Sequence, residues 1–391
     1  MNRTLLISWL GLLVCGAAGA DEQLAPNTWT RVNIDWAKVL AREVEDGRWV
    51  TTDGYSDNVL RTKTGEVLIR TGIESKKLGT SPGFYTNTTV AWDVATDEVR
   101  VVEISNFGGG SYGHGRLLPA FAAHETPTPR HTYDGICYVP EEDAAYQMLG
   151  ANRRVGGRGA EEAARQQLEI DNRSTWRYDF ASGRWRRIDH NVWKFFKTSP
   201  YESHLAHWPE GDKLLFLDDN GRRYAEFDLE TQQWQPRELA GECPMRLYNA
   251  RSTWDSRRGL WVFRLGPRLC TFDPKIRTFT KLPDCWQLPP ADSPEAKKQE
   301  PRWASKGVCY LDKHDSYLVT GPTSNDTRVY DAATGHWADL PGGDIQLPNG
   351  YCQYEPQSDL VVLSYQLQCF KLRVVLPDCF DETGTSKGDL P

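Results

Sequence analysis

The sequence YDFASGRW at residues 178–185 holds an aromatic residue, an aspartate, a short polar turn and a tryptophan six positions after the aspartate. The pattern recurs as FDLETQQW at 227–234, FDPKIRTF at 272–279 and YDAATGHW at 330–337, with a more divergent copy, WDVATDEV, at 92–99. It predicts a β-hairpin, because the aspartate can accept hydrogen bonds from the turn amides. Five copies, mostly 45–60 residues apart, indicate a protein built from repeats.

A second hairpin precedes each of these, as in 307–321, where two apolar strands flank a charged turn. Four strands per repeat is the blade of a β-propeller. Complete repeats cover 52–105, 131–190, 203–240, 247–283 and 304–341, and a sixth, from 349, has only three strands. The missing strand is predicted at 27–34, where Trp29 takes the place of Trp337, since joining the termini removes two exposed sheet edges. We therefore predict an all-β, six-bladed propeller whose last blade is closed by the N-terminal strand, with five or seven blades as alternatives.

This four-stranded repeat resembles the kelch and galactose-oxidase family of propellers over roughly residues 27–376. The paired glycines that the family carries after the second strand are reduced here to single glycines, at Gly72, Gly150, Gly266 and Gly321. The resemblance therefore concerns architecture. It implies that a ligand would bind at one mouth of the central channel.

The N-terminal residues predict export. Arg3 is followed by an apolar run and by small residues ending at Ala20, which is typical of a signal peptide covering residues 1–20. The propeller is then predicted at 21–376 and a C-terminal tail at 377–391. No later stretch is apolar enough to span a bilayer, so we expect a secreted or periplasmic protein.

Composition narrows the class of ligand. The net charge is −7 and the basic residues are spread along the chain, which gives no sign of nucleic-acid binding. Aromatic residues make up 11 % of the sequence and include 15 tryptophans.

Three insertions, 106–130, 153–173 and 286–301, interrupt the repeat, and the blade topology predicts that all three crowd the same mouth of the channel.

Alignment of the innermost strands predicts the site residues. We take Val59, Cys137, His207, Trp254, Cys309 and Cys352 as equivalent. Three positions earlier stand polar residues in every repeat: Ser56, Asp134, His204, Arg251, Lys306 and Asn349. Six positions earlier stand mostly aromatic or flat residues: Asp53, His131, Tyr201, Tyr248, Trp303 and Gln346. The candidate ligand-binding set is Asp134, His131, Tyr201, His204, Tyr248, Arg251, Trp303, Lys306 and Asn349, which would form a ring of charges beneath a collar of aromatic faces.

Aromatic platforms with polar partners suit carbohydrates, and Arg251 or Lys306 could pair with an acidic sugar. The sequence lacks the common catalytic motifs, and its histidines fit no metal-ligand spacing, so no cofactor or metal is expected and catalysis is left undecided. Three alternatives to carbohydrate binding stand. The protein could be a structural envelope protein. The resemblance to kelch propellers implies the other two: a protein-interaction scaffold, or a sugar epimerase or polysaccharide lyase with His131 or His204 as acid and base and Arg251 clamping a carboxylate.

Eight cysteines remain after removal of the leader, an even number that permits disulfides in an oxidising compartment. Cys137, Cys309 and Cys352 occupy one repeat position in the inner strands, where a small buried thiol fits. Cys243 and Cys285 flank the fourth repeat in neighbouring loops, and Cys369 lies near Cys379. These two pairs are the candidate bridges.

Overall fold

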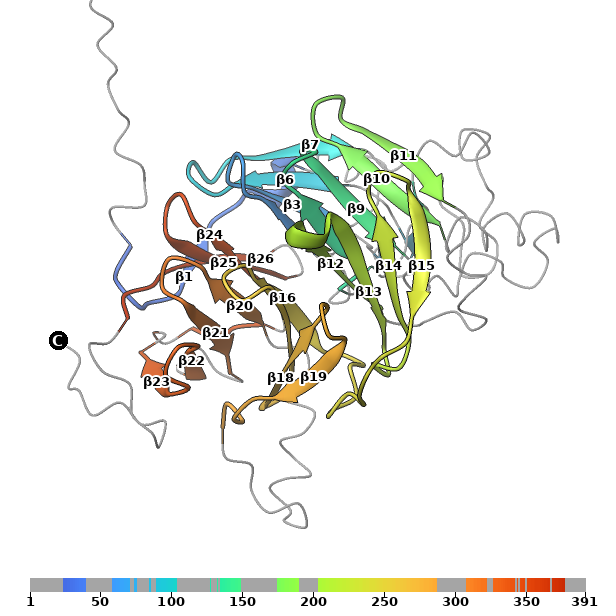
Figure 1. The fold of residues 1–391 in the computed structure, drawn as a ribbon. Coiled ribbons are helices and arrows are strands. Elements are labelled where there is room, and N and C mark those ends of the chain that lie inside the picture. The colour runs from blue at the N-terminus through green and yellow to red at the C-terminus, as the bar shows by residue number, and fades with distance from the viewer. Residues whose placement is uncertain are drawn as a thin grey trace, which may run out of the picture.

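The computed structural model describes residues 24–39, 58–70, 74–75, 84–85, 89–103, 127, 132, 134–148, 174–189, 203–286, 307–321, 326–341, 343, 345–348, 350–365 and 368–376. Within these ranges the chain forms six four-stranded antiparallel sheets, arranged as the blades of a β-propeller around a central axis (Figure 1). The predicted fold class and the number of blades are confirmed.

Each blade runs outward from an innermost strand, and the first five take their strands in chain order. Blade 1 is β2 (Asn58–Arg61), β3 (Glu66–Arg70), β6 (Thr89–Asp93) and β7 (Val99–Glu103). Blade 2 is β8 (Ile136–Val139), β9 (Ala144–Met148), β10 (Thr175–Asp179) and β11 (Arg184–Asp189). Blade 3 is β12 (Ser203–Trp208), β13 (Lys213–Asp218), β14 (Tyr224–Asp228) and β15 (Gln233–Arg237). Blade 4 is β16 (Arg251–Asp255), β17 (Leu260–Leu265), β18 (Arg268–Asp273) and β19 (Thr278–Lys281).

Blade 5 is β20 (Val308–Leu311), β21 (Ser316–Thr320), β22 (Thr327–Asp331) and β23 (Trp337–Leu340). Blade 6 is β24 (Tyr351–Glu355), β25 (Leu360–Tyr365), β26 (Gln368–Arg373) and the N-terminal β1 (Thr30–Val32). The remaining elements are small: the two-stranded sheet of β4 (Glu74–Ser75) and β5 (Phe84–Tyr85), the four-residue helix α1 (Trp36–Val39) and the 3-10 turn η2 (Pro209–Gly211). No helix of the described ranges is both long and apolar enough to cross a bilayer.

The two ends of the chain close the ring, as predicted. Strand β1 pairs antiparallel with β26, with Thr30 opposite Lys371 and Val32 opposite Cys369, and Figure 1 shows the blue β1 beside the red strands of blade 6. Trp29, just before β1, is 1 % exposed, and its indole N–H donates to Thr327 Oγ1 of blade 5 at 2.9 Å. Trp234 of blade 3 makes the same bond to Thr175 of blade 2 at 2.7 Å. Trp29 therefore fills the repeat position of an outer-strand tryptophan.

The hydrophobic core is divided into six layers, one at each junction between neighbouring blades. Trp234 of blade 3 packs among Tyr146 and Met148 of blade 2, and Trp337 of blade 5 packs with Leu269 of blade 4. Trp185, Trp234 and Trp337 are all buried, which confirms their predicted place between blades. Trp234 and Trp337 thus bury large aromatic rings against the preceding blade, which stabilises the junction between the two blades.

The predicted aspartate-capped turns are present in all five copies of the repeat. The carboxylate oxygens accept hydrogen bonds from backbone amides two or three residues on, at Asp93, Asp179, Asp228, Asp273 and Asp331. In the copy at 178–185, the amide of Ser182 donates to Asp179 at 2.8 Å. Gly183 follows in the left-handed conformation, with φ of 65°, which glycine adopts without strain.

Candidate functional site in the axial channel

The six innermost strands surround a cavity of about 370 Å³ on the propeller axis. Residues from β2, β8, β12, β16, β20 and β24 all line it. It also reaches the first turn residue after each inner strand, namely Thr62, Pro140, Pro209, Ser256, Asp312 and Pro356. The cavity therefore extends along the axis to the end of the channel where the inner strands finish, which we call the turn end.

A collar of mostly aromatic side chains surrounds the turn end. Each collar residue is the penultimate residue of its inner strand, where that strand pairs with the second strand of the blade. The six residues are Leu60, Tyr138, His207, Trp254, Tyr310 and Tyr354. All six line the cavity. Five residues after each stands a residue with positive φ: Gly65, Asp143, Asp212, Gly259, Asp315 and Asp359. The identical offset in every blade shows that these six positions are equivalent.

This register corrects the alignment of inner strands made from the sequence. His207 and Trp254 are equivalent, but their partners are Leu60, Tyr138, Tyr310 and Tyr354 in place of Val59, Cys137, Cys309 and Cys352. The sequence alignment was one residue out in three blades and two residues out in blade 6. Small residues alternate with aromatic ones in these strands, so composition alone did not fix which face each residue takes.

Polar contacts lock the collar to its turns. The hydroxyls of Tyr138, Tyr310 and Tyr354 donate to Asp143, Asp315 and Asp359 at 2.8, 2.9 and 2.5 Å. Each aspartate also contacts a basic side chain from the preceding blade: Arg61 Nε at 2.7 Å, Arg258 Nη2 at 2.9 Å and His314 Nε2 at 2.8 Å. These contacts join blades 1 and 2, 4 and 5, and 5 and 6 around the channel.

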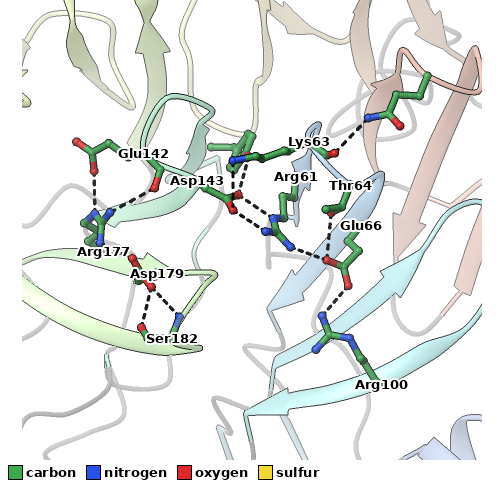
Figure 2. A network of polar contacts seen from close by, with 12 residues as sticks. Arg61, Lys63, Thr64, Glu66, Arg100, Glu142, Asp143, Arg177, Asp179 and Ser182 are labelled. Carbon is green, nitrogen blue, oxygen red and sulfur yellow. Dashed lines mark hydrogen bonds and ion pairs between the residues drawn. The ribbon is translucent and has the colours of Figure 1, made fainter. Parts of the chain in front are cut away.

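Figure 2 shows the contact between blades 1 and 2. Arg61 reaches across to Asp143 and also bonds Glu66, which in turn accepts from Arg100 at 2.6 Å. The side-chain hydrogen bond from Arg61 is the main cause that holds the pKa of Asp143 at about 2. Burial first, and then the bond to Asp143, raise the pKa of Tyr138. The network therefore keeps the carboxylate charged and the phenol protonated across the neutral pH range.

Two of the predicted site residues, His204 and Asp134, meet near the start of the inner strands, together with Ser252, which was not predicted. His204 of blade 3 places Nδ1 at 2.7 Å from Asp134 Oδ2 in the segment leading into blade 2. Ser252 of blade 4 donates to the same carboxylate oxygen. His204 Nε2 lies 3.0 Å from the carbonyl oxygen of Leu247, and since a carbonyl only accepts, Nε2 carries a hydrogen. Both ring nitrogens are therefore engaged, and the serine contacts the aspartate, so the arrangement differs from a Ser-His-Asp catalytic triad.

Arg251 also lines the cavity. It is 2 % exposed, its Nη1 donates to the carbonyl of Ala250 at 3.1 Å, and its guanidinium lies 4.1 Å from the ring centre of Tyr351 in blade 6. Tyr248 stacks instead with Arg246, whose guanidinium is 4.8 Å from its ring centre. Arg251 is thus an inner wall of the cavity, held by an aromatic ring across the channel.

The other candidate residues lie outside the described residues: His131, Tyr201, Trp303, Lys306 and Asn349, with Ser56 and Asp53. The insertion 153–173, all of 106–130 except residue 127, and all of 286–301 except residue 286 also lie outside them. From the predicted set, the structure therefore brings Asp134 and His204 into contact and places Arg251 in the cavity wall.

The collar at the turn end consists of other residues than the aromatic collar predicted from the sequence. The signal that could have found it is a tyrosine followed five residues later by aspartate, in Tyr138–Asp143, Tyr310–Asp315 and Tyr354–Asp359. His207 of the collar lies 3.7 Å from Glu141, and burial lowers its pKa although Glu141 opposes that shift. Its imidazole is therefore favoured in the neutral form, as a hydrogen-bonding wall of the cavity.

Three polar atoms in the cavity lining are buried and have no hydrogen-bond partner within the part of the chain that the structure describes. They are the indole N–H groups of Trp254 and Trp261 and the amide oxygen Oε1 of Gln353. Buried polar atoms are normally satisfied, so such atoms around a cavity point to a bound molecule or ordered water. Across the described ranges, no group of three or more His, Cys, Asp or Glu side chains could hold a metal ion.

The described cysteines are all free thiols: Cys137, Cys243, Cys270, Cys285, Cys309, Cys352 and Cys369. Cys285 is buried between blades 4 and 5, whereas Cys243 packs beside Cys270 at the junction of blades 3 and 4. The expected pairing of Cys243 with Cys285 is therefore wrong. The expected partner of Cys369, Cys379, lies outside the described residues.

No protein-family model matches the sequence, and no curated protein matches it either. Among solved structures, similarity is found to a protein of unknown function from Bacteroides thetaiotaomicron, with 12 % identity, 79 % of this chain and 67 % of that chain covered, and a TM-score of 0.45. An auxiliary nutrient binding protein from the same organism gives 10 % identity, 81 % and 68 % coverage, and a TM-score of 0.43. A nidogen/laminin complex gives 9 % identity, with 74 % of this chain and 79 % of that chain covered and a TM-score of 0.41. At these values the likenesses carry no argument about function, and the kelch resemblance stays a prediction.

Proposed function

We propose that this propeller is an exported protein that binds a carbohydrate in its axial cavity. The observation that carries the proposal is the wall of that cavity, where aromatic collar residues stand next to unsatisfied polar atoms. Its volume of about 370 Å³ lies at the lower end of the range for small-molecule sites, about 300–1,000 Å³. Such a space accommodates one or two sugar rings.

The chemistry of the wall matches a sugar better than it matches a purely apolar ligand. A sugar has apolar ring faces, which pack on aromatic rings, and hydroxyls, which both donate and accept hydrogen bonds. One hydroxyl can accept from the Trp254 indole and another can donate to Gln353 Oε1. A hydrocarbon would leave both atoms buried and unpaired, at a cost of about 1–3 kcal/mol each.

Charge favours an acidic sugar over a basic ligand. Arg251 lies in the wall, and the Asp134 carboxylate, which also lines the cavity, is already occupied by His204 and Ser252. A carboxylate on the ligand would gain a charge-assisted bond from the guanidinium. The other carboxylate of the described lining, Asp312, follows the last residue of β20 at the turn end, whereas Arg251 is the first residue of β16, so the charge beside Arg251 favours an anionic group there.

The alternative functions receive less support from the described residues. Large apolar side chains are exposed there only at Ile276 and Val375, which gives no broad apolar patch for a scaffold. For an epimerase or lyase, the candidate acid and base His204 has both nitrogens bonded within the protein. Carbohydrate binding without catalysis is therefore the function that the site favours.

The test is a thermal-shift screen of neutral and acidic mono- and disaccharides, followed by calorimetric titration of the best ligand. Trp254→Phe keeps an aromatic face but removes the unsatisfied N–H, and should weaken binding about tenfold, the equivalent of about 1.4 kcal/mol. Trp337→Phe is the matched control, because its indole N–H also has no partner among the described residues but lies between blades 4 and 5, away from the cavity. Equal affinities in the two variants, or no ligand in the panel that raises the melting temperature, would overturn the proposal.

A further inference from the structure

A pair of thiols lies at the junction of blades 3 and 4, away from the proposed ligand. Cys243 belongs to the segment between β15 and β16, and Cys270 is a fully buried residue of β18. Both side chains belong to the apolar layer between these blades, and the Cys270 thiol donates a hydrogen bond to the Cys243 sulfur. Two cysteine side chains that pack in one apolar layer and share a hydrogen bond lie close enough for a disulfide to form after adjustment of their side chains.

The surrounding backbone is shaped to admit this contact. Cys243 packs against Gly221 in the turn between β13 and β14, where a Cβ atom would stand 2.6 Å from Cys243 Cβ and 3.0 Å from its sulfur. Gly221 has φ of 63°, so glycine suits this position for its backbone as well as for its lack of a side chain. Blade 3 thereby leaves room for the Cys243 side chain to turn toward blade 4.

The two thiols differ in a way that suits thiol–disulfide exchange. Cys243 is half-buried and Cys270 is fully buried. The hydrogen bond from Cys270, together with one from the backbone amide of Met245, lowers the pKa of Cys243. The same contact with Cys243, followed by burial, raises the pKa of Cys270. Cys243 is thus the reachable nucleophile and Cys270 the internal partner.

We propose that Cys243 and Cys270 form an intramolecular disulfide that fixes the segment between blades 3 and 4 onto blade 4. The oxidant is a small-molecule or protein disulfide. The Cys243 thiolate attacks one of its sulfurs and releases the first thiolate, and Cys270 then attacks the Cys243 sulfur of the mixed disulfide and releases the second. The two protons of the cysteine thiols pass to the two released thiolates, so the cysteine pair is oxidised by two electrons and the oxidant disulfide is reduced to two thiols.

The position of the link gives it a structural consequence. Leu247, whose carbonyl holds His204, lies four residues after Cys243, and Arg251 begins β16 shortly afterwards. A bond to β18 would therefore restrain the segment that contacts His204 and leads to Arg251 of the cavity wall. This inference does not rest on the proposed ligand, because it concerns the blade junction alone.

The full-length protein is incubated with oxidised glutathione at pH 8, denatured, alkylated without reduction and digested with trypsin. The expected product is a cross-linked pair of peptides, 238–246 with 269–275, whose mass is two hydrogens below the sum of the free peptides. Reduction should split the pair and lower the melting temperature of the intact protein by several degrees, since a disulfide restrains the unfolded chain.

Cys285→Ala serves as the matched control, since it removes a buried cysteine from the neighbouring blade junction and should leave the cross-link unchanged. Cys243→Ser and Cys270→Ser should each abolish it. Recovery of Cys243 in alkylated form after oxidation, or in a link to any cysteine other than Cys270, would overturn the proposal. Because this cross-link is measured in the protein without substitutions, the test remains decisive even if a cysteine variant fails to fold.

Discussion

Replacement of Trp29 by alanine tests whether the propeller depends on closure by its N-terminal strand. The indole is 1 % exposed and belongs to the apolar layer between blades 5 and 6. Its N–H donates to Thr327 Oγ1 in blade 5 at 2.9 Å. Trp29→Ala therefore removes both a large apolar contact and a buried hydrogen bond from the junction at which the ring closes.

The expected loss of unfolding free energy is about 3–5 kcal/mol for the missing indole. Loss of the hydrogen bond from the indole to Thr327 Oγ1 adds about 1 kcal/mol to this loss. Trp29→Phe should lose little more than the hydrogen bond, again about 1 kcal/mol. Urea unfolding followed by tryptophan fluorescence and circular dichroism measures these differences, and the dependence on denaturant should stay constant if only stability changes.

Two further variants serve as controls for Trp29→Ala. Arg31→Ala changes an exposed residue of β1 and should stay within about 0.5 kcal/mol of the parent protein. Trp234→Ala removes the equivalent tryptophan, with the equivalent bond to Thr175, from within the ring and should cost about as much as Trp29→Ala. If Trp29→Ala left stability within about 1 kcal/mol of the parent while Trp234→Ala showed the full loss, the N-terminal strand would contribute nothing essential to closure.

Three other substitutions test the channel and its turns. The pKa of Asp143 is about 2 in the folded protein, below its unfolded value, so its contact with Arg61 stabilises the fold above about pH 4 and is lost as the pH falls toward 2. Asp143→Asn should flatten the acid side of the stability profile in that window, and an unchanged profile would contradict the assignment. Gly135→Ala would place a Cβ atom 2.7 Å from the carbonyl oxygen of Thr132 and should lower stability by about 1–3 kcal/mol in urea unfolding, whereas a neutral result would mean that the segment relaxes easily. Arg251→Ala should cost about 2 kcal/mol or more, because it removes a buried guanidinium from the ring of Tyr351, and full stability would show that this stacking is unimportant.

The sequence predicted the features that arise from local chemistry repeated many times. Each aspartate-capped hairpin is specified by residues within eight positions of one another, as in 178–185. Because the pattern occurs five times, the prediction does not depend on any single copy. Closure by Trp29 was predictable for the same reason, since the segment around it repeats the pattern before Trp337 and the last blade lacked one strand. The burial of Trp185, Trp234 and Trp337 follows from their place in that repeat.

The candidate site was predicted less well because it depends on how blades are aligned with one another. The inner strands of blades 3 and 4 were aligned correctly at His207 and Trp254, but blade 6 was two residues out at Cys352. A shift of one residue turns a side chain to the opposite face of a strand. The aromatic collar was therefore missed, although the candidates Asp134, His204 and Arg251 do lie at the inner strands.

What the sequence determined by itself is the repeat, its turns and the closure of the ring, because hydrogen bonds over a few residues and alternating burial encode them directly. What only the tertiary structure decided is which side chains meet across blades. Asp134, His204 and Ser252 come from three successive blade regions, and Cys243 faces Cys270 rather than Cys285. Such contacts depend on the rotation and spacing of whole sheets, which are set by the packing of the apolar layers between them, and no local sequence pattern specifies that geometry.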